Sequence, residues 1–184
     1  MDEYYRAVQA LPAWLARPLS ALTPDIAEQV HEIRLRVGCG VQLTIGGRPC
    51  CPAGLPVLQK LRLTPLQMEE IFLTLCNGSV HSHETEIAAG YVTLGCGCRA
   101  GLAGRFYCPP GQSAVLQELC SVNIRVARSR EFPLPQKLRD ILKQRFVGML
   151  LMGEPDSGKT TLLRGIAREL ASRERAVAVI DERR

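Results

Sequence analysis

The feature that most constrains this chain is the segment Gly153-Glu154-Pro155-Asp156-Ser157-Gly158-Lys159-Thr160, which matches G-x-x-x-x-G-K-[ST] at every fixed position. Its context decides whether the match has meaning. The preceding run, residues 146–152, is continuously apolar, which indicates a strand covered on both faces of a parallel sheet. Residues 159–171 then follow helical periodicity with one apolar stripe. Strand, loop and helix in this order predict a phosphate-binding loop.

The residue types of this loop suit phosphate chemistry. Glycine lets backbone N–H groups approach a phosphate closely, and the helix that follows adds its positive N-terminal end. Lys159 is expected to place its ammonium on the β- and γ-phosphates, and Thr160 to give its hydroxyl to Mg²⁺ as the metal ligand. We therefore predict ATP and Mg²⁺ as cofactors. The predicted cofactor-binding residues are Gly153, Glu154, Pro155, Asp156, Ser157, Gly158, Lys159, Thr160 and Thr161.

Two acidic residues follow the next apolar run, residues 176–180, which is the second expected strand of this sheet. Asp181 and Glu182 stand at its carboxyl end, where open α/β sheets bind their ligands. They are catalytic candidates together with Lys159, because carboxylates there can orient Mg²⁺ or an attacking water. The alternative, that they are simply charges ending a buried strand, stays equally open.

Upstream of residue 130 the pattern is different, because short helices and alternating strands replace the continuous apolar runs. Gly46-Gly47 predicts a hairpin turn, and residues 50–58 are expected to form a loop. The expected helices are residues 4–22 with breaks at Pro12 and Pro18, a short helix after Thr23-Pro24, a helix that begins at Thr64-Pro65 and ends at Asn77-Gly78, and residues 79–89. The expected strands are residues 31–37, 41–45, 91–94, a return through 105–107, and 122–126.

These patterns predict two domains joined by a charged, proline-containing linker at residues 129–135. Residues 1–130 are expected to form an N-terminal α+β domain. Residues 131–184 are expected to form the start of an α/β P-loop (RecA-like) domain, beginning with a helix at residues 137–145. Because only a short stretch follows the loop, this ATPase domain is expected to be incomplete and the chain to be C-terminally truncated.

Composition excludes several other classes. The chain has 46% hydrophobic and 22% charged residues with a net charge of +5, which is typical of a globular protein. It has no run of about 18 apolar residues and no signal-peptide pattern at its N-terminus, so its eight cysteines are expected to be free thiols in a cytoplasmic setting. Cys96-x-Cys98 and His81-x-His83 lack the spacing of a structural zinc site.

With these residues assembled, the chain resembles the stage III sporulation protein AA family, which are P-loop ATPases similar to secretion-system motors. The resemblance covers nearly the whole chain in the order that the family shows. It is carried by the stretches Glu32-Ile33-Arg34-Leu35-Arg36, Gly90-Tyr91-Val92-Thr93-Leu94, Arg99-Ala100-Gly101-Leu102-Ala103-Gly104-Arg105, Asn123-Ile124-Arg125-Val126-Ala127-Arg128, Gly158-Lys159-Thr160-Thr161-Leu162-Leu163-Arg164 and Val179-Ile180-Asp181-Glu182-Arg183.

The resemblance implies an ATP-binding and hydrolysing component of the sporulation channel complex between mother cell and forespore. Its implied partners are membrane components of that complex, with a homo-oligomeric ring by analogy with secretion motors. Its implied location is cytoplasmic or peripheral at the forespore membrane.

Three departures from the family pattern qualify this expectation. The family's loop usually reads Gly-Pro-Pro-Gly, where this chain has Gly153-Glu154-Pro155-Asp156, and Cys98 stands where a histidine is expected. The family also continues after Asp-Glu-Arg with Ser-Glu-Ile and a Walker B strand, whereas this sequence ends at Arg184. Whether the chain is an enzyme is therefore left open.

Two other functions remain as alternatives. One is a non-catalytic protein-interaction module with weak or no nucleotide binding, which the missing Walker B strand favours. The other is nucleic-acid binding through Arg34, Arg36, Arg99, Arg105, Arg125 and Arg128, which the mixed signs of charge along the chain do not favour.

Overall fold

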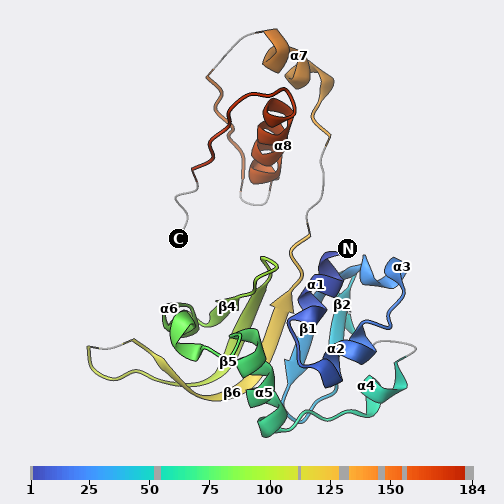
Figure 1. The fold of residues 1–184 in the computed structure, drawn as a ribbon, viewed down its shortest axis with the longest axis vertical. Helices are drawn as coiled ribbons and strands as arrows, with labels where there is room; N and C mark the ends of the chain where they lie inside the picture. Colours follow the sequence, from blue (N-terminus) through green and yellow to red (C-terminus); the bar gives the residue numbers. More distant parts are fainter. Residues whose placement is uncertain are drawn as a thin grey trace. The chain divides into compact units, whose positions relative to one another are not determined.

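A computed structural model describes residues 2–51, 55–111, 113–128, 133–144, 148–154 and 157–180. The chain divides into two compact units, Met1–Arg128 and Ser129–Arg184, which are described separately below (Figure 1). In the described part of the chain, no helix has the length and hydrophobicity that crossing a bilayer requires.

Unit 1 begins with three short helices, α1 (Glu3–Gln9), α2 (Ala13–Leu19) and α3 (Pro24–Ala27). Pro12 separates α1 from α2 as predicted, and Pro24 stands at the start of α3 as predicted. The predicted break at Pro18 is wrong. Pro18 lies inside the last turn of α2, where only one further residue follows it, so the kink that a mid-helix proline causes has little helix left to disrupt.

The first strands form an antiparallel meander, β1 (Val30–Arg36), β2 (Gln42–Ile45) and β3 (Arg48–Cys50). The hairpin predicted at Gly46-Gly47 is confirmed, because both glycines have positive φ, 55° and 79°, in the turn between β2 and β3. The alternation predicted for β1 is also confirmed, with Ile33 and Leu35 buried on one face. The loop predicted at residues 50–58 is wrong at both ends, because Cys50 belongs to β3 and Pro56 begins helix α4 (Pro56–Lys60), while residues 52–54 lie outside the described residues.

The middle of unit 1 is helical. Helix α5 (Pro65–Leu75) begins as predicted, and Thr64 and Gln67 form a reciprocal capping box that satisfies two free N–H groups at its start. The helix predicted at residues 79–89 is split into a 3₁₀ turn, η1 (Val80–His83), and helix α6 (Glu84–Ala88). Three strands complete the unit, β4 (Tyr91–Thr93), β5 (Arg99–Tyr107) and β6 (Val115–Arg125).

All six strands form one sheet in the order β3-β2-β1-β6-β5-β4. The first and last strands of the unit therefore pair at its centre, with Ile33 opposite Ile124. Between β5 and β6 the register slips beside Gly104, where the Glu118 carbonyl oxygen lies 1.9 Å from the place a Cβ would occupy. Only glycine permits that approach of two backbones.

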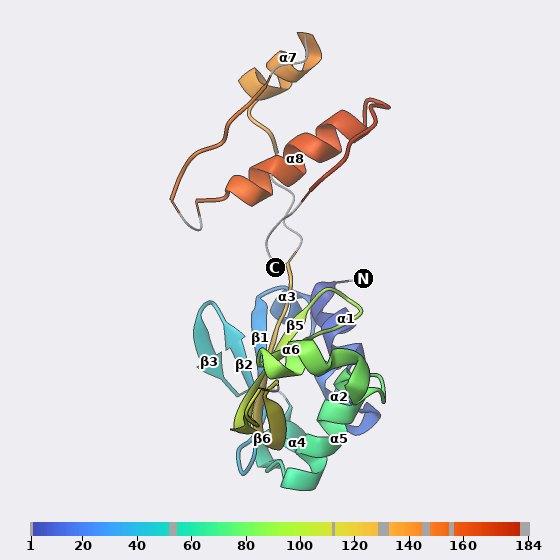
Figure 2. The same cartoon turned by 90° about the vertical axis from the view of Figure 1, so that its left-hand side faces the viewer.

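The sheet of unit 1 is covered on one face. Figure 2 shows α1, α2, α4 and α5 on the same side of the sheet. The core lies between these layers and includes Leu15, Leu35, Met68 and Ile124, each at most 1% exposed. The residues that alternate with the buried ones on β1 and β6 lie on the opposite face, where Arg36 and Arg125 are exposed and others, such as Asn123, are half-buried. Unit 1 thus has a two-layer architecture of the α+β class that was predicted.

Unit 2 contains helix α7 (Gln136–Gln144) and helix α8 (Lys159–Ala171) in its described residues. Both helices were predicted, and α8 has the predicted bounds. The strands predicted at residues 146–152 and 176–180 are not formed over the described residues 148–152 and 176–180. A strand requires a neighbouring strand to satisfy its backbone hydrogen bonds, and no strand lies in the described part of unit 2 to supply them. Leu150, Met152 and Ile180 are at least 80% exposed as a result.

Candidate nucleotide-binding loop

The candidate site is the turn that leads into α8. Gly158 is the N-cap of this helix and has a left-handed backbone with φ 84° and ψ 10°. A residue with a side chain rarely adopts that conformation, so glycine is required at the point where the chain bends into the helix. The motif's second fixed glycine therefore has a local geometric cause.

The first fixed glycine is closely packed across the turn. A Cβ on Gly153 would stand 2.8 Å from the Ser157 hydroxyl oxygen, which is closer than side-chain contacts allow. The Ser157 N–H also donates to the Glu154 carbonyl at 3.2 Å, which closes the turn. The loop thus curls back on itself between Gly153 and Ser157.

Lys159 extends back across this turn. Its ammonium donates to the carbonyl oxygens of Gly153 at 2.7 Å and Glu154 at 2.5 Å, and to the Ser157 hydroxyl at 3.3 Å. Three loop groups therefore hold the ammonium of Lys159, which is the only charged residue that the motif requires. An ammonium has three donors on a flexible stem, so the same group can also donate to an anion that approaches the turn.

The start of α8 supplies the remaining donors. In an α-helix the first N–H groups have no intrahelical acceptor, and the N-cap residue Gly158 has no side chain to cap them. Thr160 and Thr161 lie in this first turn directly after Lys159. The positive end of the helix, its N–H groups and the lysine ammonium thus converge at one end of the loop, an arrangement suited to an anion such as a phosphate.

Some predicted site residues cannot be placed. Pro155, Asp156, Asp181 and Glu182 lie outside the described residues. Gly153, Glu154, Ser157, Gly158, Lys159, Thr160 and Thr161 are described, and they lie before and in the first turn of α8. A separate hollow of about 530 Å³ in unit 2, between Leu134, Arg139 and the far half of α8, contains none of the predicted site residues.

Solved structures show the same fold in part. The pilus retraction motor PilT, solved with bound ADP, aligns over 79% of this chain and 41% of its own with a TM-score of 0.52 and 18% identity. The Legionella pneumophila ATPase DotB aligns over 77% of this chain and 38% of its own, at 14% identity and a TM-score of 0.46. At these identities the likeness to PilT concerns the fold alone.

Sequence relatives give a closer match. The stage III sporulation protein AA of Bacillus subtilis (strain 168) is 32% identical over 160 residues, which is 87% of this chain. The match covers 50% of the relative, so the chain spans about half the length of this curated protein. The family Sporulation stage III, protein AA matches residues 3–184, from the first helix through the candidate loop. This chain therefore belongs to the Sporulation stage III, protein AA family.

Proposed function

We propose that the loop from Gly153 to Thr161 binds the phosphates of ATP together with Mg²⁺. The observation that carries this proposal is the Lys159 ammonium, held over the turn by the carbonyls of Gly153 and Glu154 at the N-terminus of α8. The left-handed Gly158 supports the same assignment, because no atom lies within 4 Å of the place its Cβ would occupy and a bound group can approach the backbone there.

The residues of the loop would have distinct roles in binding. Lys159 neutralises the β- and γ-phosphates, and the N–H groups of the first turn of α8 donate to their oxygens. Thr160 supplies its hydroxyl to Mg²⁺, which would polarise the phosphates when bound. Asp181 and Glu182 are proposed to orient the metal or an attacking water from the end of the run at residues 176–180.

At the level of the cell, we propose that the chain is part of an ATP-driven component of the sporulation channel complex between mother cell and forespore. Family membership supports a role in sporulation, and the loop supports a nucleotide-dependent one. The proposed partners are membrane components of that complex and further copies of the chain in a ring, with a cytoplasmic or forespore-membrane location. We also propose that residues 131–184 belong to a P-loop ATPase domain.

A second function is favoured by one observation. The described residues around the loop carry exposed apolar side chains such as Leu150, Met152 and Val179 and no strand. Unit 1, in contrast, has a continuous buried core. In a non-catalytic module, unit 1 would contact partners and the loop would bind nucleotide weakly. Such a function would need only unit 1, which is the well-packed part of the chain.

Nucleotide titration separates these two functions. The proposal predicts saturable binding of Mg-ATP by isothermal calorimetry, with Lys159→Ala weakening it by about tenfold or more, the effect of losing a hydrogen bond to a charged group. Lys137→Ala is the matched control, because Lys137 is an exposed lysine in α7 of the same unit. Absence of binding, or equal losses in both variants, would contradict nucleotide binding at this loop. Binding without phosphate release would favour the non-catalytic function.

A further inference from the structure

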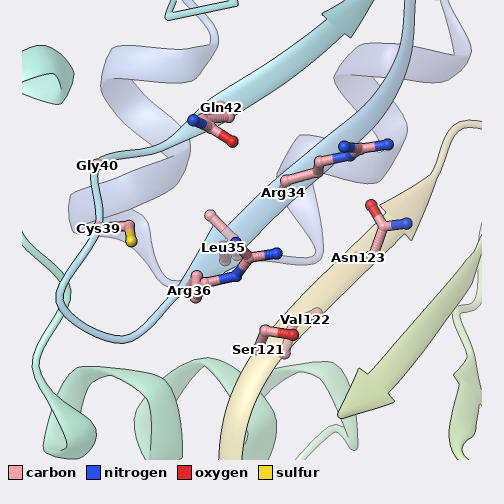
Figure 3. Close-up of a pocket in the computed structure, with 9 residues that line it drawn as sticks. All are labelled: Arg34, Leu35, Arg36, Cys39, Gly40, Gln42, Ser121, Val122 and Asn123. Carbon is pink, nitrogen blue, oxygen red and sulfur yellow. The ribbon is translucent and has the colours of Figure 1, made fainter. Parts of the chain in front are cut away.

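The open face of the unit 1 sheet contains a hollow of about 150 Å³ that is separate from the candidate loop. Figure 3 shows it between β1 and β6, with the Arg36 guanidinium extending toward β6 and the Asn123 amide directed toward Arg34. Gln42 of β2 lies on its other side. Its volume is well below the roughly 300–1,000 Å³ of a site for a drug-sized ligand, so it suits a small group.

Strand register creates this cluster. Arg36 lies directly opposite Ser121, while Arg34 lies between Gln42 on one neighbouring strand and Asn123 on the other. Directly opposed residues of antiparallel strands have Cβ atoms about 4.5–5.5 Å apart, so their polar ends can reach one ligand. Two guanidiniums, a hydroxyl and two amides therefore line a single small concavity.

The other arginines on this part of the face already have partners. Glu32 accepts two hydrogen bonds from Arg34, at 2.7 and 3.0 Å, and lies 3.8 Å from Arg125. Arg99 lies over the Tyr91 ring at 4.9 Å. Burial raises the pKa of the Glu32 carboxyl, but hydrogen bonds from Arg34, Asn123 and Thr44 and the Arg34 charge lower it more, so Glu32 stays ionised and committed to these partners.

Arg36 differs from them. Its guanidinium has no hydrogen bond, ion pair or ring contact with any of the described residues. Ser121, directly opposite, likewise has no side-chain partner among them. A positive group with five N–H donors and a hydroxyl thus line the hollow without a carboxylate between them.

Asn123 adds a complementary acceptor. Its side-chain Oδ1 atom is buried and has no hydrogen-bond partner among the described residues, while its amide group bonds Glu32. A buried acceptor without a donor costs free energy, and a ligand that carries a proton on one oxygen could remove that cost. The hollow therefore combines strong donors for an anion with one acceptor for a proton-bearing oxygen.

We propose that this hollow binds a phosphate-class oxyanion, with Arg36 as its principal, bidentate ligand. Planar guanidinium groups match phosphate oxygens in pairs, which a hydroxyl and a nearby second guanidinium can supplement. Ser121 and the remaining N–H groups of Arg34 donate to the other oxygens. Asn123 accepts from a protonated oxygen, which inorganic phosphate has at neutral pH and sulfate lacks.

The test is a titration of the full ¹⁵N-labelled chain with inorganic phosphate at constant ionic strength, followed by the amide signals of Ser121 and Asn123. The parent should show saturable shifts, with weaker binding of sulfate. Arg36→Gln should weaken phosphate binding by about tenfold or more, and its exposed, unpartnered side chain makes a folding defect an improbable cause. Arg17→Gln, which removes an exposed arginine from α2, and Lys159→Ala, in the candidate loop, should leave it unchanged.

Several outcomes of the phosphate titration would contradict binding in this hollow. Shifts that do not saturate, that persist in Arg36→Gln, or that disappear in Lys159→Ala would overturn the proposal. The source of the phosphate is resolved by co-sedimentation with phosphatidylcholine vesicles with and without phosphatidic acid. Sedimentation that requires both phosphatidic acid and Arg36 identifies a lipid headgroup, and phosphate binding without sedimentation identifies a soluble phosphate. Equal sedimentation of parent and Arg36→Gln would argue against this site as the lipid contact.

Discussion

Replacing Arg128 with methionine should be among the most destabilising single changes in unit 1. The Arg128 side chain is 13% exposed and lies where β6 leaves the sheet. It contacts Asp2 at 2.5 Å and Glu3 at 3.6 Å, and it also donates to the carbonyls of Ala27 and Val30. One guanidinium thus joins the first residues of the chain, the end of α3 and the first strand.

The loss of stability follows from the carboxylates that Arg128→Met would leave without a partner. Removing one partner of a buried ion pair costs about 3–5 kcal/mol, because the other charge remains without compensation. Asp2 is 18% exposed and keeps some access to water, so we expect a loss near the lower end, about 3 kcal/mol. For a unit of this size, that loss lowers Tm by roughly 10 °C.

The assay is urea and thermal denaturation followed by the fluorescence of Trp14, the single tryptophan, whose indole N–H donates to Glu70 at 2.9 Å within unit 1. Arg125→Met is the control, because Arg125, the last residue of β6, is 79% exposed and exposed pairs contribute only about 0–1 kcal/mol. Equal losses in the two variants, or a change in Arg128→Met below about 0.5 kcal/mol, would refute the reasoning.

Acidification provides a second check on the same contact. Burial raises the pKa of the Asp2 carboxyl, but the hydrogen bonds from Arg128 and the Tyr4 N–H and the Arg128 charge outweigh it and hold the pKa below its usual value. A lowered pKa means that the stabilisation is present above the unfolded value of about 3.9 and is lost as pH falls through the folded value. The difference between parent and Arg128→Met should therefore shrink as the pH drops below about 4.

Two further changes test local features of unit 1 by urea denaturation. Gly104→Ala should lower the free energy of unfolding by about 1–3 kcal/mol, because its Cβ would meet the Glu118 carbonyl at 1.9 Å. Gly95→Ala, where no atom lies within 4 Å of the added Cβ, should change the free energy of unfolding little. Similar values for both variants would show that β5 and β6 separate without strain. Thr64→Ala should lower the free energy of unfolding by about 1 kcal/mol by removing the cap of α5, and Thr64→Ser should keep most of that stability. An unchanged urea midpoint in the alanine variant would mean that the cap contributes nothing to stability.

Local signals in the sequence determined a large part of the secondary structure. Gly46-Gly47 specified a hairpin because few other residues adopt positive φ at both positions, and Thr64-Pro65 specified a helix start because the cap and the proline act within one turn. The spacing of glycine, lysine and threonine identified the turn before α8 for the same reason. Its curl between Gly153 and Ser157 and the left-handed Gly158 depend on neighbours within a few residues.

The failures of sequence reasoning have equally local causes. The apolar runs at residues 146–152 and 176–180 have the composition of buried strands, but composition cannot supply the neighbouring strand that their hydrogen bonds require. Pro18 was expected to break a helix because its distance from the helix end was not known.

Only the tertiary structure decided which distant residues meet. The order β3-β2-β1-β6-β5-β4 places β6 beside β1, although most of unit 1 separates them in the chain. That pairing sets Arg36 opposite Ser121 and brings Arg128 to Asp2, and no periodicity in the sequence encodes either contact. The physical reason is that helix caps and turns depend on adjacent residues, whereas strand pairing and ion pairs depend on where the whole chain folds back on itself.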